Sequence, residues 1–196
     1  MKNFLIAFVV LVVLAAFVIG PKINTIPTLD ENVNAAASAV DNQYKRRSDL
    51  IPNLIATVKG YASHEKEVLT QVTEARAKVG QITLTPEVLN NPQAFKAYQE
   101  AQDGLHSALS RLMAVSERYP DLKANQNFLN LQAQLEGTEN RIAVARRDYI
   151  ETVKNYNLEL RTIPGKWIAA IFYPDAQVKQ NFTVTPSEAV VPKVSF

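Results

Sequence analysis

Two histidines, His64 and His106, have side chains that ordinarily titrate near neutral pH, so they are the first candidates for acid–base catalysis or metal binding. His64 begins the string HEKEV, which follows the zinc-protease pattern HExxH until Val68 replaces the second histidine ligand. His106 follows Asp103 at a three-residue spacing, as in the carboxylate-x-x-His half of a di-iron bundle. A complete di-iron site needs a second such pair and two further glutamates, and none is evident. We therefore interpret His106 as a surface or bundle-edge residue and expect no metal site.

The residues that other kinds of catalytic or cofactor site require are absent from the sequence. The sequence contains no cysteine, which excludes disulfides, thiolate metal sites and cysteine nucleophiles. Its six glycines form neither a GxSxG elbow nor a phosphate-binding or dinucleotide-binding loop. We expect no catalytic residue, no cofactor and no small-molecule substrate.

The charge balance argues against a nucleic-acid partner. Lys and Arg number 21 against 19 Asp and Glu, so there is no bulk excess of positive charge. Two short basic clusters, at residues 45–47 and 146–147, could bind anionic lipid or nucleic acid. Acidic residues lie close to both, so we favour solvated or paired side chains.

Arg47 occupies a position where the helical pattern calls for an apolar residue. One interpretation is that Arg47 pairs with Glu139 or Asp148 and fixes the register of the helices, as polar groups at helix seams can. The alternative is that these residues form solvated ion pairs, each contributing less than about 1 kcal/mol.

These side chains must be positioned by helices. Apolar residues recur every three or four positions from Leu29 to Val79, which predicts one helix, or two in line, ending at Gly80. Pro52 lies within this pattern, and because the pattern continues beyond it we expect a kink there and not a break. Two further long helices are predicted over residues 95–119 and 128–160. Short connections favour an all-α, antiparallel up-and-down bundle.

The predicted helix lengths do not match. At the usual rise the first helix would be about 75 Å long and the second about 40 Å. Either the first helix folds back at Pro52, or another subunit covers it. Residues 167–173 predict a short fourth helix, which either caps the bundle or forms a foot at a membrane interface through Lys166 and Trp167.

Residues 4–20 form an uncharged apolar run between Lys2 and Lys22. A helix of this length spans roughly 25 Å, at the short end of what crosses a bilayer. A cleaved signal peptide is the alternative, but small residues at a cleavage site are missing before Pro21. We expect an uncut transmembrane anchor at 1–22, a bundle at 23–174 and an extended tail at 175–196. The few flanking charges weakly favour a domain outside the cytoplasm over a cytoplasmic one.

Two long stretches of distinctive sequence are YKRRSDLIPNLIATVKGYASHEKEVLTQVTEARAKV at 44–79 and FLNLQAQLEGTENRIAVARRDYIETVKNYN at 128–157. With DENVN at 30–34 and the Pro-Gly pair at 164–165, they resemble the LemA family of bacterial membrane proteins. The resemblance implies an N-terminal membrane segment followed by a four-helix up-and-down bundle. It implies no activity, because the family has no established biochemical function, although one relative is associated with building a membrane-bounded bacterial organelle.

Together these observations predict a non-enzymatic, single-pass membrane scaffold of the bacterial envelope that binds protein partners or forms a homo-oligomer. A first alternative is a protein that contacts or remodels lipid through residues 166–173. A second is a metal-binding enzyme of the helical-bundle type.

Overall fold

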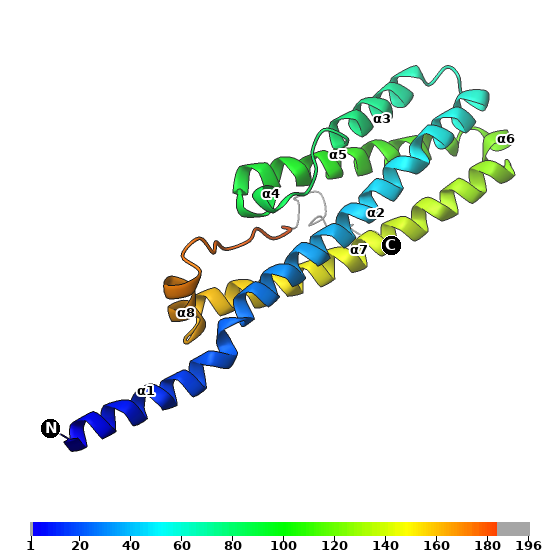
Figure 1. Cartoon of the computed structure of the whole chain (residues 1–196). Coiled ribbons are helices and arrows are strands. Elements are labelled where there is room, and N and C mark those ends of the chain that lie inside the picture. Colours follow the sequence, from blue (N-terminus) through cyan, green and yellow to red (C-terminus); the bar gives the residue numbers. More distant parts are fainter. Residues whose placement is uncertain (1, 184–196) are drawn as a thin grey trace, which may run out of the picture.

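A computed structural model describes residues 2–183, and within them the chain forms eight α-helices and no strand (Figure 1). The all-α prediction is therefore confirmed. The helices are α1 (Lys2–Ile23), α2 (Thr25–Tyr61), α3 (Lys66–Val79), α4 (Pro86–Asn90), α5 (Pro92–Ser116), α6 (Pro120–Lys123), α7 (Gln126–Arg161) and α8 (Gly165–Phe172).

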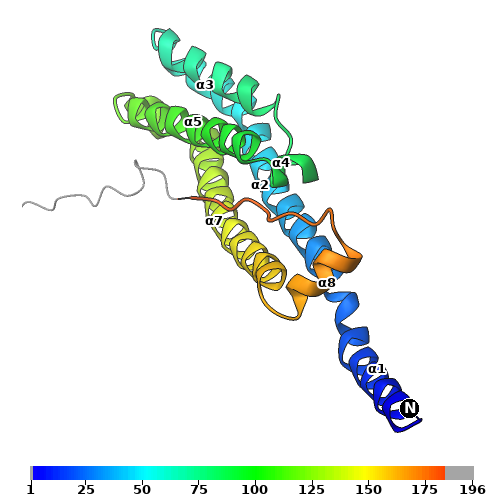
Figure 2. The same cartoon turned by 90° about the vertical axis from the view of Figure 1, so that its left-hand side faces the viewer.

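The bundle consists of two pairs of helices. The long helices α2 and α7, with 37 and 36 residues, pack against each other along their length. The shorter helices α3 and α5 form the second pair, which covers the half of α2 and α7 remote from α1 (Figures 1 and 2). Successive members α2, α3, α5 and α7 alternate in direction, giving the up-and-down order (Figure 1).

The prediction of one continuous helix to Gly80 was wrong. The chain leaves α2 after Tyr61, turns at residues 62–65 and returns as α3. Pro52 lies inside α2 with an exposed side chain, so it is not the place where the chain reverses. The apolar spacing is preserved across the turn, where the buried Ala62 donates its backbone N–H to the Val58 carbonyl. Spacing alone therefore cannot reveal the reversal at residues 62–65.

The core has two parts. What we call the proximal core, nearer α1, contains Ile26, Val33, Ala37, Val40, Tyr44, Leu84, Leu89, Phe95, Tyr98, Ile142, Tyr149, Val153, Tyr156, Ile168 and Phe182. The distal core contains Ile51, Leu54, Val58, Ala62, Val72, Val79, Leu105, Ala108, Leu109, Leu112, Leu122, Phe128 and Leu135. On α2 the boundary between the two cores falls between Tyr44 and Ile51.

The short helix α8 closes the proximal end. Gly165 begins it, and a Cβ at this position would lie only 2.2 Å from the Glu159 carbonyl oxygen, so a side chain cannot be accommodated without a shift. Ile168 packs into the proximal core, whereas Trp167 and Ile171 on the other side of α8 are exposed. The segment thus has one buried and one exposed face.

After α8 the chain lies against the bundle without regular secondary structure as far as Thr183 (Figure 1). Buried Phe182 belongs to the proximal core, so this part of the predicted tail is packed. Residues 184–196 of the predicted tail lie outside the described residues.

Helix α1 meets α2 after a single residue, Asn24, and contacts α8. None of the helices formed by residues 2–183 combines the length and apolar character required to cross a membrane.

Candidate functional site

Arg47 is the central residue of the site. Its side chain is only 2% exposed, and it lies on α2 between the proximal and distal cores. Nη2 donates to the Gln102 backbone carbonyl at 3.1 Å and to Gln102 Oε1 at 2.7 Å, while Nη1 donates to Glu139 Oε1 at 3.2 Å. The guanidinium carbon lies 4.9 Å from the centre of the Tyr44 ring. Hydrogen bonds, an ion pair and an aromatic face together compensate for removing this charge from water.

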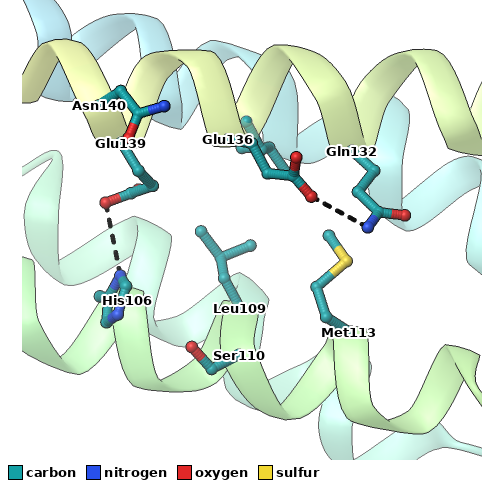
Figure 3. A pocket seen from close by; sticks show the side chains of 9 residues that line it. His106, Leu109, Ser110, Met113, Gln132, Glu136, Glu139 and Asn140 are labelled. Carbon is teal, nitrogen blue, oxygen red and sulfur yellow. Dashed lines mark hydrogen bonds and ion pairs between the residues drawn. The ribbon is translucent and has the colours of Figure 1, made fainter.

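Glu139 links this buried charge to the surface. Its side chain is 33% exposed, and Oε2 lies 3.5 Å from His106 Nδ1 on α5 (Figure 3). One carboxylate therefore contacts a cation on α2 and an imidazole on α5 while itself belonging to α7. We call Arg47, Gln102, His106 and Glu139 the polar layer.

Two of the three residues proposed from sequence for a polar seam come together, and the third does not. Arg47 contacts Glu139, whereas Asp148 is exposed and lies 3.5 Å from Arg147. Gln102 was missed, because a glutamine in an amphipathic helix gives no sign that it is buried. Its position four residues before His106, on the same side of α5, is the only available signal.

The polar layer shifts the titration of its members. The hydrogen bond that His106 donates to Glu139 raises the pKa of His106 above its usual 6.5, and the charge of Glu139 adds to this against the opposing effect of burial. Burial by itself would raise the pKa of Glu139. The hydrogen bond from His106 and the charge of Arg47 outweigh burial, and the pKa falls below its usual 4.5.

A groove between α5 and α7 adjoins the polar layer, and we call it the α5–α7 groove. One part is a cavity of about 190 Å³ bordered by Arg47, Gln102, His106, Glu139 and Arg146, among others. The second part, of about 630 Å³, shares His106 and Glu139 and extends along both helices (Figure 3). Its walls are Leu109, Ser110 and Met113 from α5 and Gln132, Leu135, Glu136 and Asn140 from α7.

The groove suits binding better than catalysis. Apolar side chains alternate with polar ones along it, and its histidine and nearest carboxylate are already paired with each other. Among residues 2–183 no group of three or more His, Asp or Glu side chains is placed to hold a metal ion. His64 lies in the exposed turn between α2 and α3, so HEKEV does not lie on one helix.

The basic clusters differ in environment. Lys45 and Arg46 are exposed on α2, whereas their neighbour Arg47 is buried in the polar layer. On α7, the Arg146 guanidinium lies 4.7 Å from the centre of the Phe182 ring and is half-buried. One arginine of each cluster, Arg47 or Arg146, therefore contacts other side chains of the fold.

Glu139→Ala should destabilise the protein by about 2–3 kcal/mol, because it leaves the buried Arg47 charge without its counter-ion. Arg47→Met combined with Glu139→Ala should restore the free energy of unfolding to within about 1 kcal/mol of wild type, since no buried charge remains. Urea unfolding followed by circular dichroism measures both. A double variant less stable than Glu139→Ala would contradict this account.

Glu139→Gln should lower the pKa of His106 toward 6.5, because the carboxylate that stabilises the imidazolium is lost. In wild type, the stability that protonated His106 contributes is complete below pH 6.5 and is lost as pH rises through the raised pKa. Titration of the His106 ring signals by NMR measures the shift. Glu136→Gln is the matched control, because Glu136 borders the same groove but pairs with Gln132. An equal shift of the His106 pKa in both variants would refute the conclusion that Glu139 raises it.

Comparison with known proteins gives several relatives. Magnetosome protein MamQ 2 of Paramagnetospirillum magneticum (strain AMB-1) is 29% identical over 164 residues, which cover 76% of this chain and 60% of the relative. MamQ of Magnetospirillum gryphiswaldense is 26% identical over the same shares of the two chains. Protein LemA of Metamycoplasma hominis is 24% identical over 159 residues, which cover 81% of this chain and 68% of that protein. The chain thus spans less than two thirds of the length of the MamQ proteins.

The sequence profile of the LemA family matches residues 36–196. This region contains α3, α5 and α7 complete, most of α2, and all four residues of the polar layer. The resemblance noted from residues 44–79 and 128–157 is thereby confirmed, and the chain belongs to the LemA family.

Proposed function

We propose that this protein is a non-enzymatic, membrane-anchored helical scaffold of the bacterial envelope. The observation that carries the proposal is the surface of α1, which extends away from the bundle (Figure 1). Among the described side chains of α1, the large apolar ones that are more than half accessible are Phe4, Ile6, Phe8, Val9, Val10, Val13 and Phe17. An apolar surface of this kind is a membrane or protein contact in a working protein.

The sequence of α1 supports a membrane in preference to a protein partner. Residues 4–20 carry no charge, and Lys2 and Lys22 can reach the headgroups on either side. We propose a single-pass anchor at 1–22, with the bundle at 23–174 and the following tail outside the cytoplasm.

The surface of the bundle supports the proposal of a partner-binding role. A shallow cavity of about 340 Å³ lies between α2 and α7, bordered by Ala39, Val144, Ala145 and Asp148 among others. Val144 in this cavity is 48% exposed. Two relatives are named as magnetosome proteins, and by analogy we propose that this chain takes part in a membrane-associated assembly, with another protein or with further copies of itself.

A photoreactive phenylalanine analogue at Val144 should crosslink in cells to a partner or to a second copy, because Val144 borders the proposed contact. Mass spectrometry of the crosslinked bands identifies the species. The control is the same analogue at Lys59, an exposed residue near the C-terminal end of α2 that does not border the cavity. Monomer alone from the Val144 variant, or equal products from both, would contradict the proposal.

A second candidate role, contact with lipid, is favoured by α8. Helix α8 contacts α1, and its exposed side chains include Trp167, Ile171 and Phe172 with the cation Lys166. Leu158 and Arg161 at the end of α7 and Ile163 in the turn before α8 are exposed as well. Aromatic and cationic residues around an apolar patch are typical of segments at the headgroup level of a bilayer. We propose that this face of α8 rests on the membrane that α1 enters.

Trp167 is the single tryptophan of the sequence, so its fluorescence reports the position of α8 without any substitution. In vesicles carrying the full chain, we expect emission shifted to the blue and quenched by lipids brominated near the headgroup, because the ring lies in the interface. Ile171→Glu should weaken the quenching. Vesicle flotation separates the two roles: protein that floats without quenching would refute the α8 contact alone, and protein that does not float would refute the anchor.

A further inference from the structure

The polar layer contains one buried donor that the fold does not pair. Nη1 and Nη2 of Arg47 make three hydrogen bonds to Glu139 and Gln102, but Nε has no hydrogen-bond partner among residues 2–183. The Arg47 side chain is 2% exposed, so bulk solvent does not reach this nitrogen. Buried donors in folded proteins are generally paired with protein, with ordered water or with a ligand. The unpaired Nε therefore points to a further acceptor beside Arg47.

Arg47 borders a cavity that has room for such an acceptor. It is the smaller cavity of the α5–α7 groove, of about 190 Å³, and its walls come from α2, α5 and α7. Tyr44 and Gln102, each 3% exposed, also border it, with a hydroxyl and an amide nitrogen that can donate. The volume is several times that of one water molecule, which occupies about 30 Å³ in the liquid. A small organic molecule can therefore fit among these donors.

The charges around this cavity favour an occupant with one negative charge. The basic side chains on its walls are Arg47, Arg146 and His106, and the acidic ones are Asp103 and Glu139. The hydrogen bond that His106 donates to Glu139 raises the pKa of His106, which increases its protonated fraction at neutral pH. With His106 protonated, the basic groups exceed the acidic groups by one. A monoanion balances this difference, whereas the two carboxylates repel a dianion.

The cavity communicates with the larger part of the α5–α7 groove. Both parts are bordered by His106 and Glu139, whose side chains are 58% and 33% exposed (Figure 3). Beyond these two residues the groove is lined by Ser110, Met113 and Gln132, among others. A ligand whose charged end lies in the cavity can therefore extend a short organic chain along the groove.

We propose that this cavity binds the carboxylate of a small organic monoacid. One carboxylate oxygen accepts from Arg47 Nε, the other accepts from the Tyr44 hydroxyl, and His106 supplies positive charge at the mouth. A carboxylate suits these groups because it has a single charge and accepts hydrogen bonds at both oxygens. Arg47 thereby obtains an acceptor for its remaining buried donor.

The two histidines of the sequence allow the site and a control position to be observed together. Butanoate is titrated into the full chain in detergent micelles, and the ring signals of His106 and His64 are followed by NMR. We expect a saturable shift of the His106 signals only, because His64 lies in the exposed turn between α2 and α3. Butanamide, a neutral molecule of the same shape, should bind at least about tenfold more weakly, since it cannot balance the charge. Malonate, a dianion, should also bind more weakly than butanoate.

Tyr44→Phe removes one proposed donor and keeps the ring beside Arg47, so it should weaken butanoate binding by about tenfold. Tyr61→Phe is the matched control, at an exposed tyrosine near the end of α2, and should leave the affinity unchanged. In wild type, the affinity for butanoate should fall as pH rises through the raised pKa of His106, because a positive charge at the mouth is lost.

Equal shifts of the His64 and His106 signals would overturn the proposal, as would equal affinities for butanoate and butanamide. Malonate binding as tightly as butanoate would exclude a site for monoacids. An unchanged affinity in Tyr44→Phe would also contradict the proposed contacts. Circular dichroism of both variants establishes that the bundle is intact when the affinities are compared.

Discussion

The bundle depends on burying one guanidinium group. Arg47 is almost completely removed from water, so each of its donors needs an acceptor and its charge needs a counter-charge. Gln102 and Glu139 supply three acceptors and the counter-charge from two other helices, whereas the buried Nε has no hydrogen-bond partner among residues 2–183. Sliding α2 along α7 by one turn would break the contact with Glu139 while the apolar residues on either side could still find apolar neighbours. We predict on this basis that the polar layer selects one register of α2 against α7, which is the role that such groups have in coiled coils.

The same layer joins the two pairs of helices. The pairs α2–α7 and α3–α5 each have close internal packing, and Arg47 and Glu139 of the first pair meet Gln102 and His106 of the second. The α5–α7 groove lies beside this junction, and its walls combine polar side chains with the apolar groups of Leu109, Met113 and Leu135 (Figure 3). A cleft with mixed walls is left beside the point where the pairs are connected.

The sequence predicted the all-α class, the positions of α5, α7 and α8, and Glu139 as one of two possible partners of Arg47. Each came from a strong local signal: helical periodicity bounded by prolines, or a charge at an apolar position. The reversal at residues 62–65 was not predictable in this way, because the turn preserves the spacing between Val58 and Val68. Gln102 and the packed tail were missed for another reason. Their burial is created by residues distant in sequence, such as Arg47 for Gln102 and Phe95 for Phe182.

The proximal core shows why the tail belongs to the fold. The pair α3–α5 covers only the distal half of α2 and α7, so the apolar residues of the other half need separate cover (Figure 2). Helix α4, helix α8 and the chain to Thr183 supply it. Lys179 is buried there because Asp30 lies 2.9 Å from its ammonium group, and the neighbouring Phe182 ring lies 5.1 Å from Phe95. A segment without regular structure thus stabilises the end of the bundle nearest α1, and it does so by joining α2, α4, α5 and α7.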